Sequence, residues 1–115
     1  MLQKYAPVKI VFIFMALIFF ATNAYSNSDD QKAFALAKQH ACLGCHAVDK
    51  KVVGPSFQSV AKKYQHDQSA PTFLKNKITK GGSGSWGVVP MPANAKLSDA
   101  DLSLLVNWIL RGAPN

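Results

Sequence analysis

The chain has 115 residues, of which 49% are hydrophobic, and it carries a formal net charge of +7. This length allows one small domain and excludes division into several. The basic balance favours acidic protein partners over nucleic acid, because the lysines are scattered and do not alternate with aromatic side chains as in a nucleic-acid platform.

The first 26 residues have the layout of a secretory signal peptide. Lys4 and Lys9 precede an apolar run at residues 10–21, and small residues suited to cleavage follow at 22–26. The run is shorter than the roughly 20 apolar residues that a membrane span needs, although an uncleaved anchor is the alternative. We therefore expect an exported protein with a domain at 27–115, which reaches the membrane only if the signal segment stays uncleaved.

The first part of this domain is expected to be helical. Ser28-Asp29-Asp30-Gln31 has capping-box form and predicts a helix to about His40, with Phe34, Ala37 and Ala41 on one face. After the Gly54-Pro55 break, apolar residues at i, i+3, i+4 and i+7 predict a short second helix. That face consists of Phe57, Val60, Ala61 and Tyr64.

The second part predicts two more helices separated by a loop. Pro71 suits the first turn of a helix that stops at Gly81-Gly82. A glycine-rich loop covers residues 81–92. Ser98 is a good N-cap for a last helix, which ends at Arg111-Gly112. Its apolar stripe consists of Leu102, Leu105, Val106, Ile109 and Leu110, and no convincing strand pair is visible, so the fold class is all-α.

Cys42-Leu43-Gly44-Cys45-His46 is the most specific motif of the chain. Two thiols three positions apart, followed at once by a histidine, are typical of a c-type haem attachment site. The thiols of Cys42 and Cys45 would add across the two vinyl groups of one porphyrin, and His46 would be an axial ligand of the iron. The alternatives are weaker. A thioredoxin-like pair needs a βαβ context, a zinc site needs another ligand such as His40 or His66, and a disulfide would close a very tight loop.

Met91 is the candidate for the second axial ligand. It lies between Pro90 and Pro92, which stiffen the backbone on both sides. Met91 is also the one methionine outside the predicted signal peptide. His40 and His66 are the competing ligands, and a core-filling methionine is the alternative role. Histidine and methionine together would fill both axial positions and favour ferrous iron, which suits one-electron transfer rather than oxygen chemistry.

The domain as a whole resembles the short bacterial class I monohaem cytochromes c, the small periplasmic electron donors of respiration and denitrification. Five motifs carry the resemblance, and their order and spacing agree along the chain. They lie at residues 42–46, 53–57, 78–87, 90–94 and 97–110. The resemblance implies four or so short helices wrapped around one covalently bound haem c.

The resemblance also implies roles for four further cofactor-binding residues. The Pro55 carbonyl would accept a hydrogen bond from His46, although a plain turn proline is the alternative. The Trp86 indole N–H would reach a haem propionate, with Lys77 as a basic residue nearby; haem packing and a surface lysine are the alternatives. Asn94 would touch the Met91 sulfur, or else cap a loop.

One departure from the family pattern is visible. Ala37 lies where close relatives often carry a bulky aromatic side chain, and Phe34 would fill that space from the neighbouring turn. Trp108 and Phe34 are expected to pack helices together rather than to take part in redox chemistry.

These observations predict a monomeric one-electron carrier without enzymatic activity. The expected partners are redox proteins with acidic docking patches: a quinol-oxidising complex as donor, and a terminal oxidase, nitrite reductase or peroxidase as acceptor. Two alternatives stay open. One is a haem-bearing subunit of a larger redox complex, and the other is a ligand-sensing or peroxidatic haem protein in which Met91 is displaced.

Overall fold

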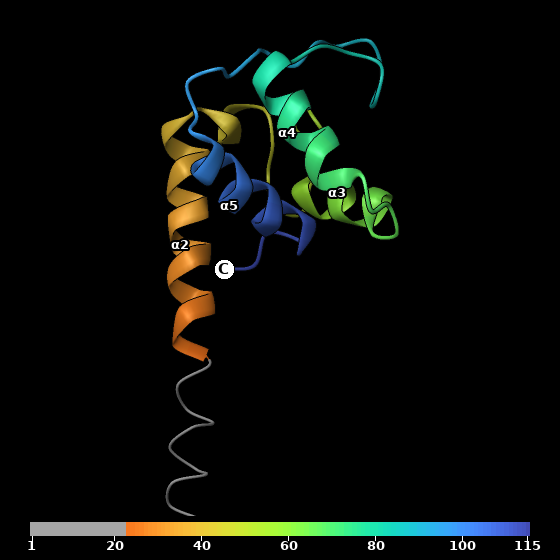
Figure 1. Cartoon of the computed structure of the whole chain (residues 1–115). Coiled ribbons are helices and arrows are strands. Elements are labelled where there is room, and N and C mark those ends of the chain that lie inside the picture. The colour runs from red at the N-terminus through yellow and green to blue at the C-terminus, as the bar shows by residue number, and fades with distance from the viewer. Residues whose placement is uncertain (1–22) are drawn as a thin grey trace, which may run out of the picture.

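The computed structural model describes residues 23–115, with side chains from residue 28 onward, and this part of the chain is all-α as predicted (Figure 1). It contains the helices α2 (Asn23–Gln39), α3 (Phe57–Tyr64), α4 (Ala70–Lys80) and α5 (Asp99–Leu110), and the 3-10 turn η1 (Cys42–Gly44). Most of the predicted signal peptide lies outside the described residues. None of the helices described is long and apolar enough to cross a membrane.

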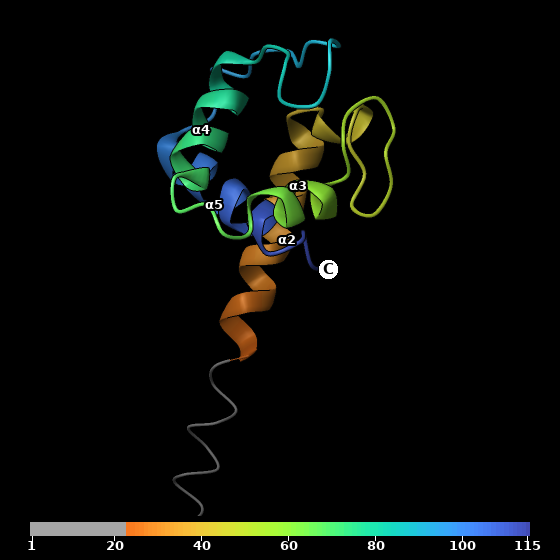
Figure 2. The ribbon, with the colours of Figure 1, turned by 90° about the vertical axis from the view of Figure 1, so that its right-hand side faces the viewer.

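Helix α5 is the centre of the domain, because it packs against α2, α3 and α4 (Figures 1 and 2). Its side chains Leu105, Val106 and Trp108 are almost entirely buried. The predicted cap is present, since the Ser98 hydroxyl accepts a hydrogen bond of 3.1 Å from the Asp101 amide. Each helix of the domain thus buries its apolar face against one well-capped helix at the C-terminal end.

Helix α2 packs against α5 through a face that shares Ala37 with the predicted one but differs from it at Phe34 and Ala41. The buried side chains are Ala33, Leu36 and Ala37, whereas Phe34 is 40% exposed and Ala41 is exposed. The alanines at 33, 35 and 37 do not indicate which face of the helix is buried. The prediction therefore relied on the large side chain of Phe34, which is not in the buried face. The Phe34 ring lies at the edge of the interface, with its centroid 6.2 Å from that of Trp108. The predicted helix–helix packing role of both rings is therefore confirmed.

The ends of α2 also differ from the prediction. The described part of the helix already includes residues before Ser28, so the expected cap at Ser28 lies within it. At its other end Ala41 has φ 59°, a left-handed conformation that turns the chain into η1. The Asp30 carboxylate, which is buried, pairs with the Arg111 guanidinium just after α5. This ion pair joins the first and last helices of the domain.

Helices α3 and α4 follow the sequence prediction closely. The α3 residues Phe57 and Val60 are buried, and the Ser56 hydroxyl caps the helix by accepting a hydrogen bond of 3.0 Å from the Ser59 amide. Helix α4 has Pro71 in its first turn and ends at Gly81. The segment that follows, residues 81–92, is the predicted loop.

Candidate functional site

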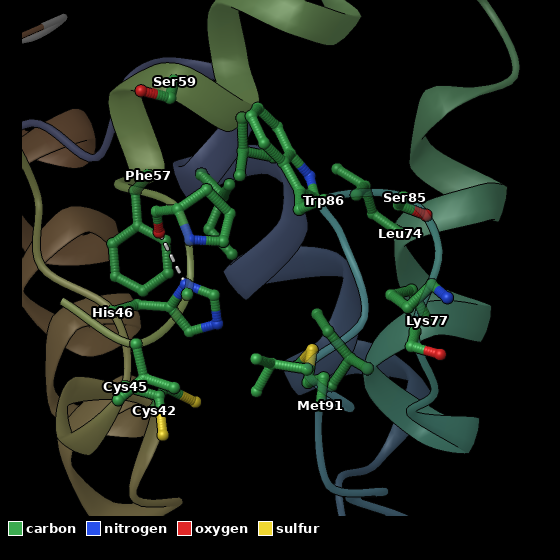
Figure 3. Close-up of a pocket in the computed structure, with 18 of the residues that line it drawn as sticks. Cys42, Cys45, His46, Phe57, Ser59, Leu74, Lys77, Ser85, Trp86 and Met91 are labelled. Carbon is green, nitrogen blue, oxygen red and sulfur yellow. Dashed lines mark hydrogen bonds between the residues drawn. The ribbon is translucent and has the colours of Figure 1, made fainter. Parts of the chain in front are cut away.

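A cleft of about 290 Å³ opens between α3, α4, α5, the Cys42–His46 segment and the loop after α4 (Figure 3). Its walls are mainly apolar. The hydrophobic side chains that line it include Phe57, Val60, Tyr64, Phe73, Leu74, Ile78, Leu105 and Ile109. A cleft of this kind suits a flat apolar ligand whose polar groups stay near the opening.

The His46 ring is held in the cleft by three contacts. Its Nδ1 lies 2.7 Å from the Pro55 carbonyl oxygen. Its ring stacks against that of Phe57, with 5.4 Å between centroids and 19° between planes. Gly54 lies so close that a Cβ added there would be 2.5 Å from His46 Cε1. These three contacts restrict the orientation of the imidazole.

The hydrogen bond also selects the tautomer of the neutral ring. A carbonyl oxygen only accepts, so Nδ1 is the donor, and in the neutral imidazole the lone pair is then on Nε2. No hydrogen-bond partner for Nε2 exists among residues 23–115, and the ring is directed into the cleft (Figure 3). A free nitrogen lone pair in an apolar cleft is a ready ligand for a metal ion.

Cys42 and Cys45 are half-buried free thiols at the edge of the same cleft. The η1 turn brings them to one side, and the Cys42 thiol lies 3.8 Å from the His40 carbonyl oxygen. Burial raises the pKa of the Cys42 thiol, and the neighbouring Cys45 adds to the rise. Both sulfurs lie on the His46 side of the cleft, as a covalent attachment through them requires (Figure 3).

Met91 faces His46 from the opposite side of the cleft (Figure 3). Its backbone forms an isolated bridge with Gly82, made of two hydrogen bonds of 2.9 Å. Gly81 has φ 67°, and a Cβ added there would collide with the Met91 carbonyl oxygen. The glycines at the end of α4 therefore let the backbone of Met91 lie directly against that helix.

The remaining predicted residues divide into two groups. Pro55, Lys77 and Trp86 line the cleft together with the cysteines, His46 and Met91. Asn94 does not line it, and its side-chain amide donates a hydrogen bond of 3.5 Å to the His40 carbonyl. The competing ligand His66 is exposed and lies outside the cleft lining. The roles of all these residues toward a cofactor stay predictions.

Sequence reasoning missed three residues around this site. Gly54 and Phe57 both contact the His46 ring, although sequence reasoning gave them no role toward the ring beyond a chain break, a helix face and membership of the 53–57 motif. Lys63 was treated as one of many scattered lysines, but its Nζ lies 4.4 Å from the centroid of the Trp86 ring. Gly54 and Phe57 lie close in sequence to Pro55, the predicted partner of His46, so a contact with the same ring could have been predicted. Nothing in the sequence indicated the contact of Lys63.

Comparison with known proteins gives consistent matches. The family model described as Cytochrome c matches residues 31–113. Cytochrome c-552 of Nitrosomonas europaea is 49% identical over 75 residues, 65% of this chain and 73% of that protein. Cytochrome c-552 of Hydrogenobacter thermophilus is 41% identical over 99 residues, 86% of this chain and 94% of that protein. The crystal structure of wild-type Nitrosomonas europaea cytochrome c552 matches with a TM-score of 0.65 and 47% identity, covering 68% of this chain and 96% of that one.

Proposed function

The chain belongs to the cytochrome c family, with one haem c attached through Cys42 and Cys45, and we propose that it is a periplasmic one-electron carrier. In this proposal His46 Nε2 and the Met91 sulfur would hold the iron of the haem. The observation that carries it is their placement: the two side chains face each other across one apolar cleft, with both thiols at the edge of that cleft.

The donor set fits the haem group. A bound haem supplies an iron that changes its charge by one electron. The Pro55 carbonyl holds Nδ1–H of His46 at 2.7 Å, which orients the ring and makes Nε2 a stronger donor. Gly54 and Phe57 prevent the ring from turning away.

On the other side of the cleft, a thioether is a soft, neutral ligand that raises the reduction potential. Pro90 and Pro92 stiffen the backbone around Met91, and the bridge to Gly82 fixes its distance from α4. Two protein ligands on the iron favour electron transfer over the binding of small molecules. We therefore propose no enzymatic activity.

The polar groups of the cleft suit the acidic end of the haem group. Lys77 and the Trp86 indole N–H are donors that line the cleft, and each would hold a propionate there. Asn94 lies three residues after Met91, and its backbone amide donates a hydrogen bond of 2.9 Å to the Ile78 carbonyl. We assign to Asn94 a tuning role toward the Met91 sulfur.

Export and docking complete the proposal. Residues 1–26 would be removed as the protein reaches the periplasm, where haem c is attached. The basic surface would steer the carrier toward acidic patches on a quinol-oxidising complex and on a terminal oxidase, nitrite reductase or peroxidase. Such encounters bury little surface and are short-lived.

Two measurements on the exported protein test this function. The intact mass of the periplasmic form should equal residues 27–115 plus one haem, which tests cleavage and attachment together. The Met91→Ala variant should have a lower reduction potential than the wild type and should bind cyanide in the ferric state without delay. A Met91→Ala variant with unchanged potential and unchanged cyanide binding would refute the ligand assignment.

A further inference from the structure

Lys63 connects α3 to the loop that covers the cleft. Its Nζ donates a hydrogen bond of 2.6 Å to the Ser85 carbonyl oxygen. The same ammonium group lies 4.4 Å from the centroid of the Trp86 ring, within the range of a cation–π interaction. One side chain thus holds two successive residues of the loop.

The rest of the described chain makes few other contacts with this loop. The bridge between Gly82 and Met91 closes its base, and a hydrogen bond of 2.8 Å from the Gly84 amide to the Gly87 carbonyl lies within it. Among residues 23–115, the bond from Lys63 is the only hydrogen bond that connects residues 83–90 to the rest of the domain. The apolar residue Val88 at the far end of the loop is 91% exposed. Of residues 83–90 all but Ser85 are exposed, so packing against the rest of the described chain holds the loop only weakly.

We propose that Lys63 is a positioning residue of the haem site, which acts through Ser85 and Trp86 to keep the loop and Met91 closed over the cleft. Lys63 is not among the residues that line the cleft, so it does not act by contact with the cofactor. The inference rests on the proposed function, because it assumes that Met91 is an iron ligand. In this inference, the position of Met91 depends in part on the ammonium group of Lys63, which lies on α3 and not on the loop.

The size of the effect follows from the two contacts. A hydrogen bond to a charged donor and an exposed cation–π contact each contribute a modest free energy. Together they should make opening of the loop about tenfold rarer, since about 1.4 kcal/mol corresponds to a factor of ten. Removal of the Lys63 side chain should therefore raise the rate of any process that requires an open loop by about this factor.

The test uses the holoprotein with three variants. Lys63→Ala removes both contacts, and Lys63→Arg keeps a cation and a donor of similar reach. Lys62→Ala is the matched control, because it removes the same charge from the next position of α3, where the side chain is exposed and has no hydrogen bond, ion pair or ring contact among the described residues.

Two readouts report on the loop. The first is hydrogen exchange of the Trp86 indole N–H by NMR, with Trp108 as internal reference, since that buried indole donates a hydrogen bond of 2.9 Å to the Pro114 carbonyl. The second is the rate at which cyanide displaces Met91 from ferric iron. Lys63→Ala should raise both rates about tenfold and leave Trp108 unchanged, whereas Lys62→Ala and Lys63→Arg should stay near wild type.

The outcomes separate this inference from the proposed function. If Lys63→Ala matches Lys62→Ala in both readouts, Lys63 does not position the loop, and the inference is wrong while the carrier function stands. If the wild-type ferric protein already binds cyanide as fast as Met91→Ala, Met91 is not a ligand, and the proposed function fails first.

Discussion

The contact between Gly54 and His46 predicts a large effect for a very small substitution. In Gly54→Ala the new methyl carbon would lie 2.5 Å from Cε1, 2.9 Å from Nδ1 and 3.0 Å from Nε2 of the imidazole. Similar distances to three ring atoms mean that the methyl group meets the face of the ring. Movement of the ring away from Gly54 is restrained, because its Nδ1 is bonded to the Pro55 carbonyl and its plane stacks on Phe57.

The magnitude follows from these two restraints. Overpacking by one methyl group in a tight site costs about 1–3 kcal/mol. Loss of the hydrogen bond to Pro55 adds about 0.5–1.5 kcal/mol. We expect Gly54→Ala to lower the free energy of unfolding by about 2–4 kcal/mol, a large part of the roughly 5–15 kcal/mol that stabilises a typical domain.

The assay is urea unfolding of the holoprotein, with Gly44→Ala as the control. A Cβ at Gly44 meets no atom within 4 Å, and Gly44 is not in the left-handed region. With a urea m-value of about 2 kcal/mol/M, Gly54→Ala should lower the midpoint by about 1–2 M, whereas Gly44→Ala should leave it unchanged or raise it slightly. Equal midpoints for the two variants would refute the close packing of Gly54 on the ring.

Three further predictions concern the rest of the domain. Arg111→Ala should destabilise by about 1–3 kcal/mol, because it leaves the buried Asp30 carboxylate unpaired; adding Asp30→Asn should recover part of the loss in thermal unfolding, and no recovery would contradict the pairing. Ala41→Gly should stabilise by about 0.5 kcal/mol, since it relieves a left-handed alanine at an exposed site but adds freedom to the unfolded chain; a clear loss in urea unfolding would speak against that backbone conformation. Hydrogen bonds from the Ser69 hydroxyl and amide hold the pKa of Asp67 below its ordinary 3.8. The folded state thus favours the charged carboxylate of Asp67. The difference in unfolding free energy between wild type and Asp67→Ala should therefore be full above pH 3.8 and decrease as the solution is acidified below it. A difference that increases on acidification would contradict the lowered pKa.

Local signals were sufficient for most of the helices. The apolar spacing of α3, Pro71 and Gly81 at the two ends of α4, and Ser98 at the start of α5 each act within one or two turns, and these predictions are confirmed. Helix α2 shows the limit. Its buried face is set by the close approach of α5 to Ala33 and Ala37, and alanine marks neither a core nor a surface position in a sequence.

The same distinction applies to the site. The thiols and His46 lie within five consecutive residues, so their grouping was visible in the sequence, and Met91 stood out between its two prolines. The contacts of Gly54 with the ring of His46 and of Lys63 with Trp86 were not visible in this way. The second of these joins residues 23 positions apart whose meeting depends on how α3 and the loop pack.

The two sides of the cleft differ in how firmly they are held, and this difference bears on the function. His46 is fixed by a hydrogen bond, a stacked ring and a glycine in direct contact, all contributed by residues 54–57 that lead into α3. Met91 is held by the two hydrogen bonds of its bridge to Gly82, at the base of an exposed loop, and by Lys63, which contacts that loop from α3. If both side chains hold the iron as proposed, a perturbation should release the sulfur before it releases the imidazole. The proposed carrier would need both ligands in place as the iron changes charge, so the contact of Lys63 with the loop would help to set how well the chain keeps small molecules away from the metal.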